Sequence, residues 1–232
     1  MSTVDTTDGI LDSNAISPTD KNGRPIPVTI PVMLAPGVRV VYTTRLGGVS
    51  QGDAAGLNLG GKNGDDPNHV AANRAALADE IDARLSLVSQ IHSGTAIDMD
   101  ETYAPNRDYG FDATGGALPD GGEPEATVIE ADAQVTTRRG VALGVFAADC
   151  LPVLLADAEA GVIGVAHCGR RGLQQGVIGE TVRMMTGKGA SVERMVATLG
   201  PCICGDCYEV GESIAVEFDA RFPGTATTTR FG

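Results

Sequence analysis

Short apolar runs alternate along the chain with polar, glycine-rich segments, and most of the runs have the length of a strand. The sequence VRVVYTT at 38–44 predicts a buried strand, and LVSQI at 87–91 predicts a second, shorter one. The pattern is tightest in the second half of the chain, where strand-length runs follow one another closely. We predict strands there at 133–136, 141–147, 152–156, 162–166 and 195–199.

Helix signals lie between these runs. Asp66 followed by Pro67 is typical of a helix start, because the carboxylate caps free N–H groups and proline suits the first helical position. This helix is predicted to continue to Ile81. A second helix is predicted at 173–185 and a short one after Gly211. Strands and helices therefore intermix, which favours an α/β fold with mixed sheets.

The polar segments suggest the domain boundaries. Residues 1–27 are rich in Ser, Thr, Asp and Pro, which predicts a flexible leader, and residues 28–232 are expected to form a single domain. The stretch 98–125 is full of Gly, Pro and Asp and is predicted to be a long surface loop.

Composition narrows the class of function. Seventeen basic against 30 acidic residues give a net charge of −13, which disfavours nucleic acid and anionic membranes as partners. No run approaches the roughly 18 apolar residues of a membrane helix. The five cysteines, an odd number, indicate free thiols in a reducing, cytoplasmic compartment.

Three residues at strand ends are candidates for chemistry. His92 and His167 each follow an apolar run, and Cys150 follows GVFAAD. Two imidazoles and one thiolate suit Zn²⁺, and three protein ligands leave the fourth position open for water or substrate, as catalytic zinc requires. Two other interpretations stay open: ordinary buried side chains, or a dyad in which the Cys150 thiolate is the nucleophile and His167 the base. His69, in a polar helix, is expected to be a surface residue.

Arginines and further thiols lie near these candidates in sequence. His167 opens HCGRRG, so Arg170 and Arg171 are placed for phosphate, and Arg45 ends another strand. Pairing with surface carboxylates is an equally good interpretation of these arginines. A C-x-C-x-x-C cluster could bind a second metal, but it lacks a fourth ligand, so a thiol-bearing loop near the cleft is the better hypothesis. Its members are Cys202, Cys204 and Cys207.

Several segments in register resemble the bacterial laccase-domain family, described both as multicopper polyphenol oxidases and as zinc-dependent purine nucleoside phosphorylases. The resemblance runs from about Val38 to Phe218. Its motifs are TTRLGGVSQG, LNLG, DDPNHVAANR, SQIHS, DAQVTTRRGVALGVFAADCLPVLLAD, GVIGVAHCGRRG and GPCICGDCYEVG.

The resemblance implies roles for individual residues. His92, Cys150 and His167 match the family's metal ligands, which implies a Zn²⁺ cofactor, with Cu²⁺ as the alternative. Residues Arg45, Ser50, Asn58 and Arg171 match its binding site for substrate and phosphate. The implied fold is a four-layer α/β/β/α sandwich similar to toxin-type cysteine deamidases.

Two departures from the family pattern affect these expectations. Arg170 replaces the family's Trp and Cys168 its Ala, which puts stacking against the substrate in question. The chain also ends at Gly232, before a last helix and strand that the resemblance implies, so we expect a C-terminal truncation or a shorter relative.

The implied activity is phosphorolysis of adenosine, inosine, guanosine or methylthioadenosine to the base and ribose 1-phosphate, with adenosine deamination as a second activity. Purine nucleosides and phosphate are thus the expected partners of a monomer or small homo-oligomer. The alternatives are a copper-dependent polyphenol oxidase, which three histidines serve poorly, a metal-independent Cys/His amidohydrolase, and a binding module without catalysis.

Overall fold

A five-stranded mixed sheet forms the centre of the computed structural model, which describes residues 19–102 and 129–225. Its first two strands are parallel and the other neighbours are antiparallel. The strand order is β4 (Ala96–Asp98), β5 (Ala133–Thr136), β8 (Val162–Cys168), β7 (Leu151–Asp157) and β9 (Val196–Leu199).

Two smaller sheets complete the β-structure of the described residues. An antiparallel pair joins β1 (Thr29–Ala35) to β2 (Val38–Thr43), and a parallel pair joins β3 (Arg84–Ser86) to β6 (Val141–Leu143). The helices are α1 (Pro67–Ile81), α2 (Met99–Thr102), α3 (Arg170–Gln174), α4 (Val177–Gly187) and α5 (Glu212–Arg221), with a 3-10 turn at Gly52–Ala54. The expected α/β fold with mixed sheets is confirmed.

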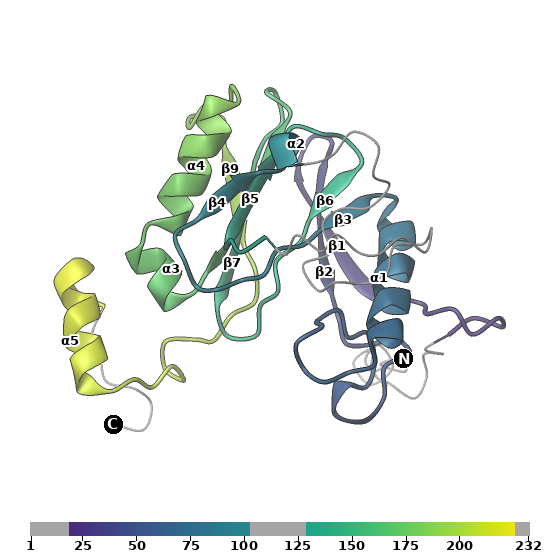
Figure 1. Ribbon diagram of the computed structural model, residues 1–232. Coiled ribbons are helices and arrows are strands. Elements are labelled where there is room, and N and C mark those ends of the chain that lie inside the picture. Colours follow the sequence, from purple (N-terminus) through teal and green to yellow (C-terminus); the bar gives the residue numbers. More distant parts are fainter. Residues whose placement is uncertain (1–18, 103–128, 226–232) are drawn as a thin grey trace, which may run out of the picture.

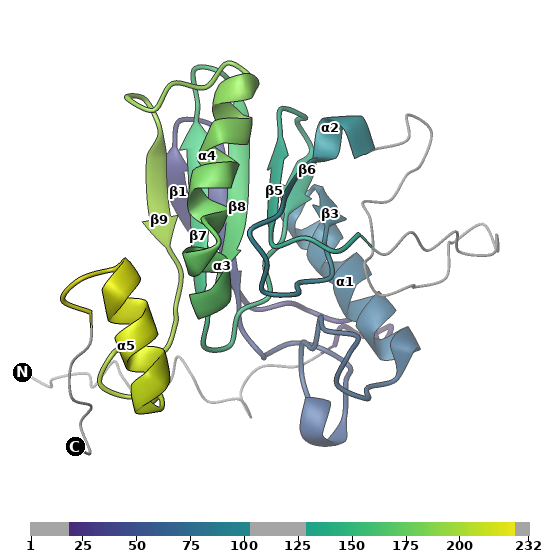
Figure 2. The ribbon, with the colours of Figure 1, turned by 60° about the vertical axis from the view of Figure 1, so that its left-hand side comes forward.

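Helices α3 and α4 cover one face of the large sheet, whereas the two small sheets lie on its other side and α1 lies beyond them (Figure 1). A second view separates α4 from α1 in the same way (Figure 2). Strands β7 and β8 are buried on both faces, which explains why their sequences are almost continuously apolar.

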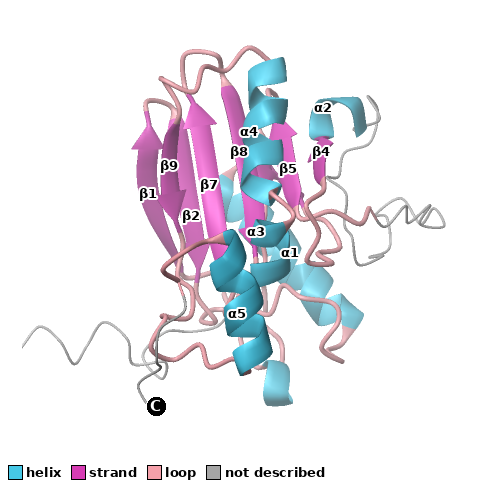
Figure 3. Ribbon diagram, turned by 90° about the vertical axis from the view of Figure 1, so that its left-hand side faces the viewer, coloured by secondary structure: helices cyan, strands magenta, loops and turns pink. Residues whose placement is uncertain are grey.

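The core lies between α4 and the centre of the sheet (Figure 3). Val135, Val162, Val177 and Met185 are fully buried there. Burying an aliphatic side chain of this size stabilises the fold by about 1.5–3 kcal/mol. These residues therefore hold β8, the strand that carries His167, against α4.

Local sequence signals predicted several elements well. The Asp66 carboxylate accepts a hydrogen bond from the Asn68 amide (2.8 Å), and α1 ends where Asp82 takes a left-handed conformation (φ 51°). The predicted strands at 38–44, 133–136, 152–156, 162–166 and 195–199 and the helix after Gly211 are confirmed within a few residues.

The predicted strand at 87–91 was wrong and the one at 141–147 was too long, and the side chain of Gln90 explains both differences. The segment 87–91 contains only an isolated bridge at Ser89, and β6 stops at Leu143. The Gln90 amide donates to the Phe146 carbonyl and accepts from the Phe146 N–H, both at 2.7 Å. A side chain thus replaces the backbone ladder where a strand pair was expected.

Other predictions were wrong for local reasons. Gly176, at φ 81°, divides the predicted helix 173–185 into α3 and α4. The predicted loop 98–125 begins instead with the end of β4 and with α2, where the Asp98 carboxylate accepts from the Asp100 amide; residues 103–128 lie outside the described residues. Strand β1 was missed because most of its residues are exposed and it contains Pro31.

Candidate metal centre

Three side chains from distant parts of the sequence meet at one end of the large sheet. Cys150 directly precedes β7, and His167 lies in β8 opposite Pro152. The ligand atoms of His92, Cys150 and His167 all lie within 4.8 Å of one another. The structure therefore brings together the three predicted ligands.

The spacing of the group suits a tetrahedral metal. Cys150 Sγ lies 3.7 Å from His92 Nε2, close to the roughly 3.6 Å that tetrahedral zinc with ordinary Zn–S and Zn–N bonds requires. The two imidazoles meet edge to face, with centroids 4.8 Å apart. His92 is exposed and His167 is buried, so the group opens to solvent on one side.

Asp132, which the sequence analysis did not single out, holds this group together. It is 1% exposed, and its carboxylate accepts from the peptide N–H groups of Ile91, His92 and Ser93, from the Ser93 hydroxyl and from His167 Nδ1. Burial acts to raise the pKa of Asp132, but the hydrogen bonds from His167 and Ser93 outweigh it and lower the pKa. The only sequence signal was its place directly before β5.

The contact with Asp132 determines how His167 can be used. His167 Nδ1 lies 2.8 Å from Asp132 Oδ1, and since an ionised carboxylate only accepts, Nδ1 carries the proton. The remaining ring nitrogen, Nε2, is then free to bind a metal. Carboxylates are common partners of metal-binding histidines for this reason.

His92 is held by its backbone. It has φ 61°, a left-handed conformation that few non-glycine residues adopt. The bond from its N–H to Asp132 (3.0 Å) stabilises this conformation. One carboxylate therefore positions both histidines.

Cys150 is half-buried. Burial raises the pKa of its thiol, and the nearby carboxylates of Asp149 and Asp132 raise it further. In this environment a thiolate needs a positive charge close to it, as a bound divalent cation would supply. Among the described residues, the polar neighbour of this thiol is the imidazole of His92.

Gly169 makes room for the group. A Cβ at this position would lie 2.8 Å from Cys150 Sγ and 2.9 Å from His92 Cδ2. Contacts this short do not occur without displacement of one of the groups. Residue 169 is therefore a glycine because its backbone lies too close to Cys150 and His92 for any side chain.

Both arginines of this motif lie in α3. Arg170 donates to Gln174 (3.0 Å), which in turn donates to Glu217 of α5 (2.9 Å). Arg170, which replaces the Trp of the family pattern, thus belongs to a hydrogen-bond network that links α3 to α5. Arg171 is exposed.

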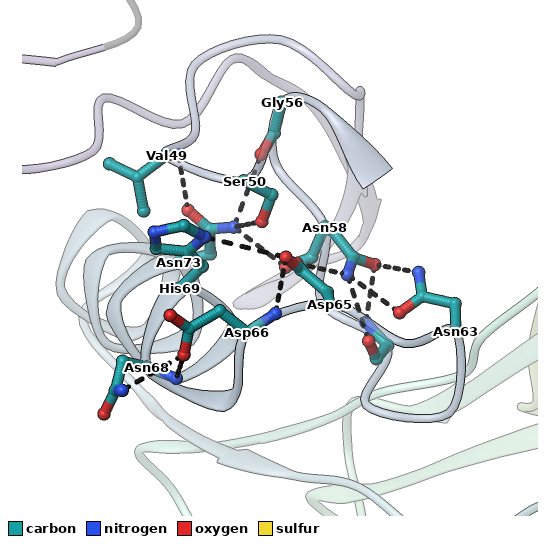
Figure 4. Close-up of polar contacts among 11 residues, drawn as sticks. Val49, Ser50, Gly56, Asn58, Asn63, Asp65, Asp66, Asn68, His69 and Asn73 are labelled. Atoms are coloured by element: carbon teal, nitrogen blue, oxygen red, sulfur yellow. Dashed lines mark hydrogen bonds and ion pairs between the residues drawn. The ribbon is translucent and has the colours of Figure 1, made fainter. Parts of the chain in front are cut away.

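The other predicted substrate residues lie between β2 and α1, and Figure 4 shows two of them, Ser50 and Asn58. Arg45 is exposed and donates to the Ala55 carbonyl (3.1 Å). The Ser50 hydroxyl accepts from Asn73 (2.9 Å), and the Asn58 amide donates to Asp65 (2.7 Å). Ser50 and Asn58 therefore stabilise the loop.

Asn73 of α1 was also missed. It is fully buried, accepts from the Val49 N–H (3.0 Å) and donates to Ser50 and to the Asn58 carbonyl (Figure 4). His69, expected at the surface, is partly exposed, with Nδ1 3.6 Å from Asp65. It takes no part in the candidate metal centre.

The three later thiols are exposed and free. Within residues 19–102 and 129–225, the group of His92, Cys150 and His167 is the one cluster of three or more side chains with metal-binding spacing. The second metal site considered for the C-x-C-x-x-C motif thus gains no support. No helix in these same ranges is both long and apolar enough to span a bilayer.

Comparison with known proteins decides the family. Residues 39–231 match the family described as multi-copper polyphenol oxidoreductase laccase. The chain belongs to this laccase family. The resemblance found in the sequence is thereby confirmed.

Two proteins named purine nucleoside phosphorylase and one named adenosine deaminase are similar to this chain in sequence. A Corynebacterium glutamicum protein named purine nucleoside phosphorylase is 43% identical over 198 residues, which cover 84% of this chain and 73% of the relative. A Streptomyces griseus protein of the same name is 41% identical, with 82% and 71% covered. A protein from an unknown prokaryote, named adenosine deaminase, is 36% identical, with 78% and 66% covered.

Solved structures of similar proteins share the fold. A crystal structure of a Neisseria meningitidis protein matches with a TM-score of 0.68 and 33% identity, covering 85% of this chain and 71% of that one. A Bacillus licheniformis protein matches with a TM-score of 0.63 and 26% identity, covering 80% and 66%.

Proposed function

We propose that this laccase-family chain is a zinc-dependent purine nucleoside phosphorylase that also deaminates adenosine. The observation that carries the proposal is the group of His92, Cys150 and His167 with ligand atoms within 4.8 Å. The names of the relatives from Corynebacterium and Streptomyces support the phosphorylase activity. The name of the more distant relative supports the deaminase activity.

The donor set favours zinc. One thiolate and two neutral imidazoles with an open fourth position form an ordinary catalytic zinc site. A multicopper oxidase needs several clustered ligand sets. The whole chain has three histidines, and His69 is engaged with Asp65, which leaves the copper alternative poorly supported.

The raised pKa of Cys150 also disfavours a metal-free cysteine hydrolase. Such an enzyme needs a thiol that ionises easily, whereas burial and two nearby carboxylates oppose ionisation here. In addition, the ring nitrogen that lies 3.7 Å from the Cys150 sulfur belongs to His92, and not to His167, the base of the proposed dyad.

The residues of the chain have distinct tasks in the proposed reaction. When bound, zinc supplies Lewis acidity that polarises an oxygen of substrate or water. Asp132 orients His167 and the backbone of His92. Arg171 and Arg45, both exposed, are proposed to hold phosphate, with Ser50 and Asn58 shaping the nucleoside side of the site.

Phosphorolysis then requires attack of a phosphate oxygen on ribose C1′. The C1′–N bond breaks, its electron pair leaves with the purine, and the base takes up a proton. The products are ribose 1-phosphate and the free base. Guanidinium groups lower the repulsion between the phosphate and the acidic protein during this step.

We also propose how the layers of the fold are arranged. The arrangement of helices, large sheet, small sheets and α1 supports a four-layer α/β/β/α sandwich of the toxin-deamidase type. We also propose one domain over 28–232, a monomer or small homo-oligomer, and a cytoplasmic location.

The test is purine release from adenosine and inosine, with and without phosphate, on protein whose zinc content is known from elemental analysis. We expect about one zinc per chain and base release that depends on phosphate. Cys150→Ala should lose zinc and turnover together, while Cys202→Ala, outside the group, should keep both. Full zinc content and full turnover in Cys150→Ala would exclude the assignment.

A further inference from the structure

The segment after β9 runs beside the loop that carries Cys150. The Gly200 N–H donates to the Pro152 carbonyl (2.9 Å), and the Ile203 N–H donates to the Asp149 carbonyl (3.0 Å). These bonds extend the pairing of β9 with β7 as far as the residue next to Cys150. Whatever follows Ile203 is therefore attached to the edge of the candidate metal centre.

A tight turn follows, with a cysteine at each end. The N–H groups of Cys207 and Tyr208 both donate to the Cys204 carbonyl at 3.1 Å. A bond from residue i+3 back to residue i closes a turn whose end Cα atoms lie less than about 7 Å apart. A disulfide needs a Cα separation of about 4.4–6.8 Å, so the turn holds Cys204 and Cys207 at bonding range.

Both thiols of the pair are also accessible. The neighbouring Cys204 side chain raises the pKa of Cys207. Both thiols are free and exposed, whereas Cys168 is buried in the core. No third ligand completes a metal site around them within the described ranges. Oxidation is the chemistry that two adjacent, accessible thiols support best.

We propose that Cys204 and Cys207 form a reversible disulfide by exchange with a low-molecular-weight disulfide of the glutathione type. The Cys204 thiolate attacks one sulfur of that disulfide and releases the first small thiol. Cys207, the later thiol to react, then attacks Sγ of Cys204 and releases the second. Two protein thiols are oxidised, the small disulfide is reduced to two thiols, and these take up the two protons.

The disulfide acts on the site through Ile203. The disulfide ring begins at Cys204, the residue after Ile203, whose N–H donates to the Asp149 carbonyl. The ring restricts the motion of the turn, so the Ile203–Asp149 hydrogen bond opens less often. This inference does not depend on the proposed function, because the exchange needs neither zinc nor nucleoside.

The experiment uses the full chain, reduced and then incubated with glutathione disulfide in the presence of a chelator. After acid quenching and alkylation, peptide mass mapping is expected to find a Cys204–Cys207 bond and the loss of both as alkylatable thiols. Exposed Cys202 is the internal control and should carry glutathione. Hydrogen exchange at the Ile203 amide should slow severalfold in the oxidised protein.

Two variants sharpen the result. Cys207→Ser should keep glutathione on Cys204, because the thiol at the other end of the turn is missing, and Cys202→Ser should still form the Cys204–Cys207 bond. The inference is overturned if glutathione remains on both Cys204 and Cys207 of the unchanged chain, if the bond involves Cys202, or if both thiols stay alkylatable while Cys202 reacts.

Discussion

Asp132 shows how one side chain can determine the geometry of a site without touching its reacting atoms. Oδ1 accepts from His92 and His167, and Oδ2 accepts from Ile91 and Ser93. Every partner is a donor, so both oxygens must be acceptors. An amide, which has one oxygen and one NH2 group, cannot satisfy this arrangement in either orientation.

Asp132→Asn is therefore expected to weaken zinc binding by about 10- to 100-fold, the range typical for partners of metal-binding histidines. The measurement is a competition titration with a chromophoric chelator. Cobalt substitution adds a spectroscopic test, since a displaced histidine changes the absorption bands. Ser93→Ala, which removes a single donor to the same carboxylate, should cost less. Equal affinities for zinc in Asp132→Asn and the unchanged chain would refute this role.

Gly169 gives a second prediction at this scale. In Gly169→Ala the new methyl group would lie 2.8 Å from Cys150 Sγ, so we expect the sulfur to move and zinc content to fall. The matched control is Gly179→Ala, where a methyl group meets nothing within 4 Å. Elemental analysis of both variants after the same purification decides the matter; full zinc in Gly169→Ala would show that the ligands tolerate the displacement.

At the scale of elements, the contact between α4 and β8 depends on a missing side chain. A Cβ at Gly164 would lie 2.8 Å from Met185 Sδ and 3.0 Å from Thr181 Cγ2, and both residues are fully buried. The helix can lie this close to the strand because residue 164 is glycine. Core positions of this kind resist added volume.

We expect Gly164→Ala to lower the free energy of unfolding by about 1–3 kcal/mol, the usual cost of overpacking. Gly179→Ala, on the open side of α4, should instead raise it by about 0.5–1 kcal/mol through helix propensity. Urea denaturation of both variants measures the two changes. Equal stabilities would mean that α4 can shift on the sheet without loss.

The elements also show where reasoning from sequence succeeds and where it stops. The start of α1 and the apolar strands β5, β7 and β8 follow from neighbouring residues, and they were predicted. Gln90 and Asp132 act on partners more than 30 residues away in sequence, Phe146 and the two histidines, so no local pattern reveals them. The same holds for the candidate site: its ligands were foreseen from residue type and position, but not the carboxylate that orients them.

At the scale of the whole molecule, carboxylates with lowered pKa values make stability depend on acid. Asp157 ends β7 and accepts from the Ser191 N–H (2.8 Å) and from Arg194 (2.8 Å), which tie the loop before β9 to the sheet. These contacts, the Ser191 bond first, lower the pKa of Asp157 to about 2. The pKa values of Asp100 and Asp132 are lowered as well.

The sign of the pH dependence follows. A carboxylate whose pKa is lower in the folded state binds fewer protons there, so its full contribution is present above its ordinary pKa of 3.8 and is lost as the pH falls towards 2. We expect the free energy of unfolding to fall between about pH 4 and pH 2. Asp157→Asn should be less stable at pH 7 and show a shallower fall.

Arg194→Gln provides the comparison. It keeps the carboxylate and its bond from Ser191, so most of the acid dependence should remain. Urea denaturation at a series of pH values measures all three proteins. An unchanged slope in Asp157→Asn would assign the acid dependence to other carboxylates.

The antiparallel pairing of β5 with β8, which sets Ala133 opposite Ala166, also orders events during synthesis. His92 leaves the ribosome long before His167, and Asp132 leaves between them. Until β8 has emerged, Asp132 has no imidazole to hold, and the His92 ring has no second histidine beside it. The group of His92, Cys150 and His167 can therefore assemble only after most of the described fold has been translated.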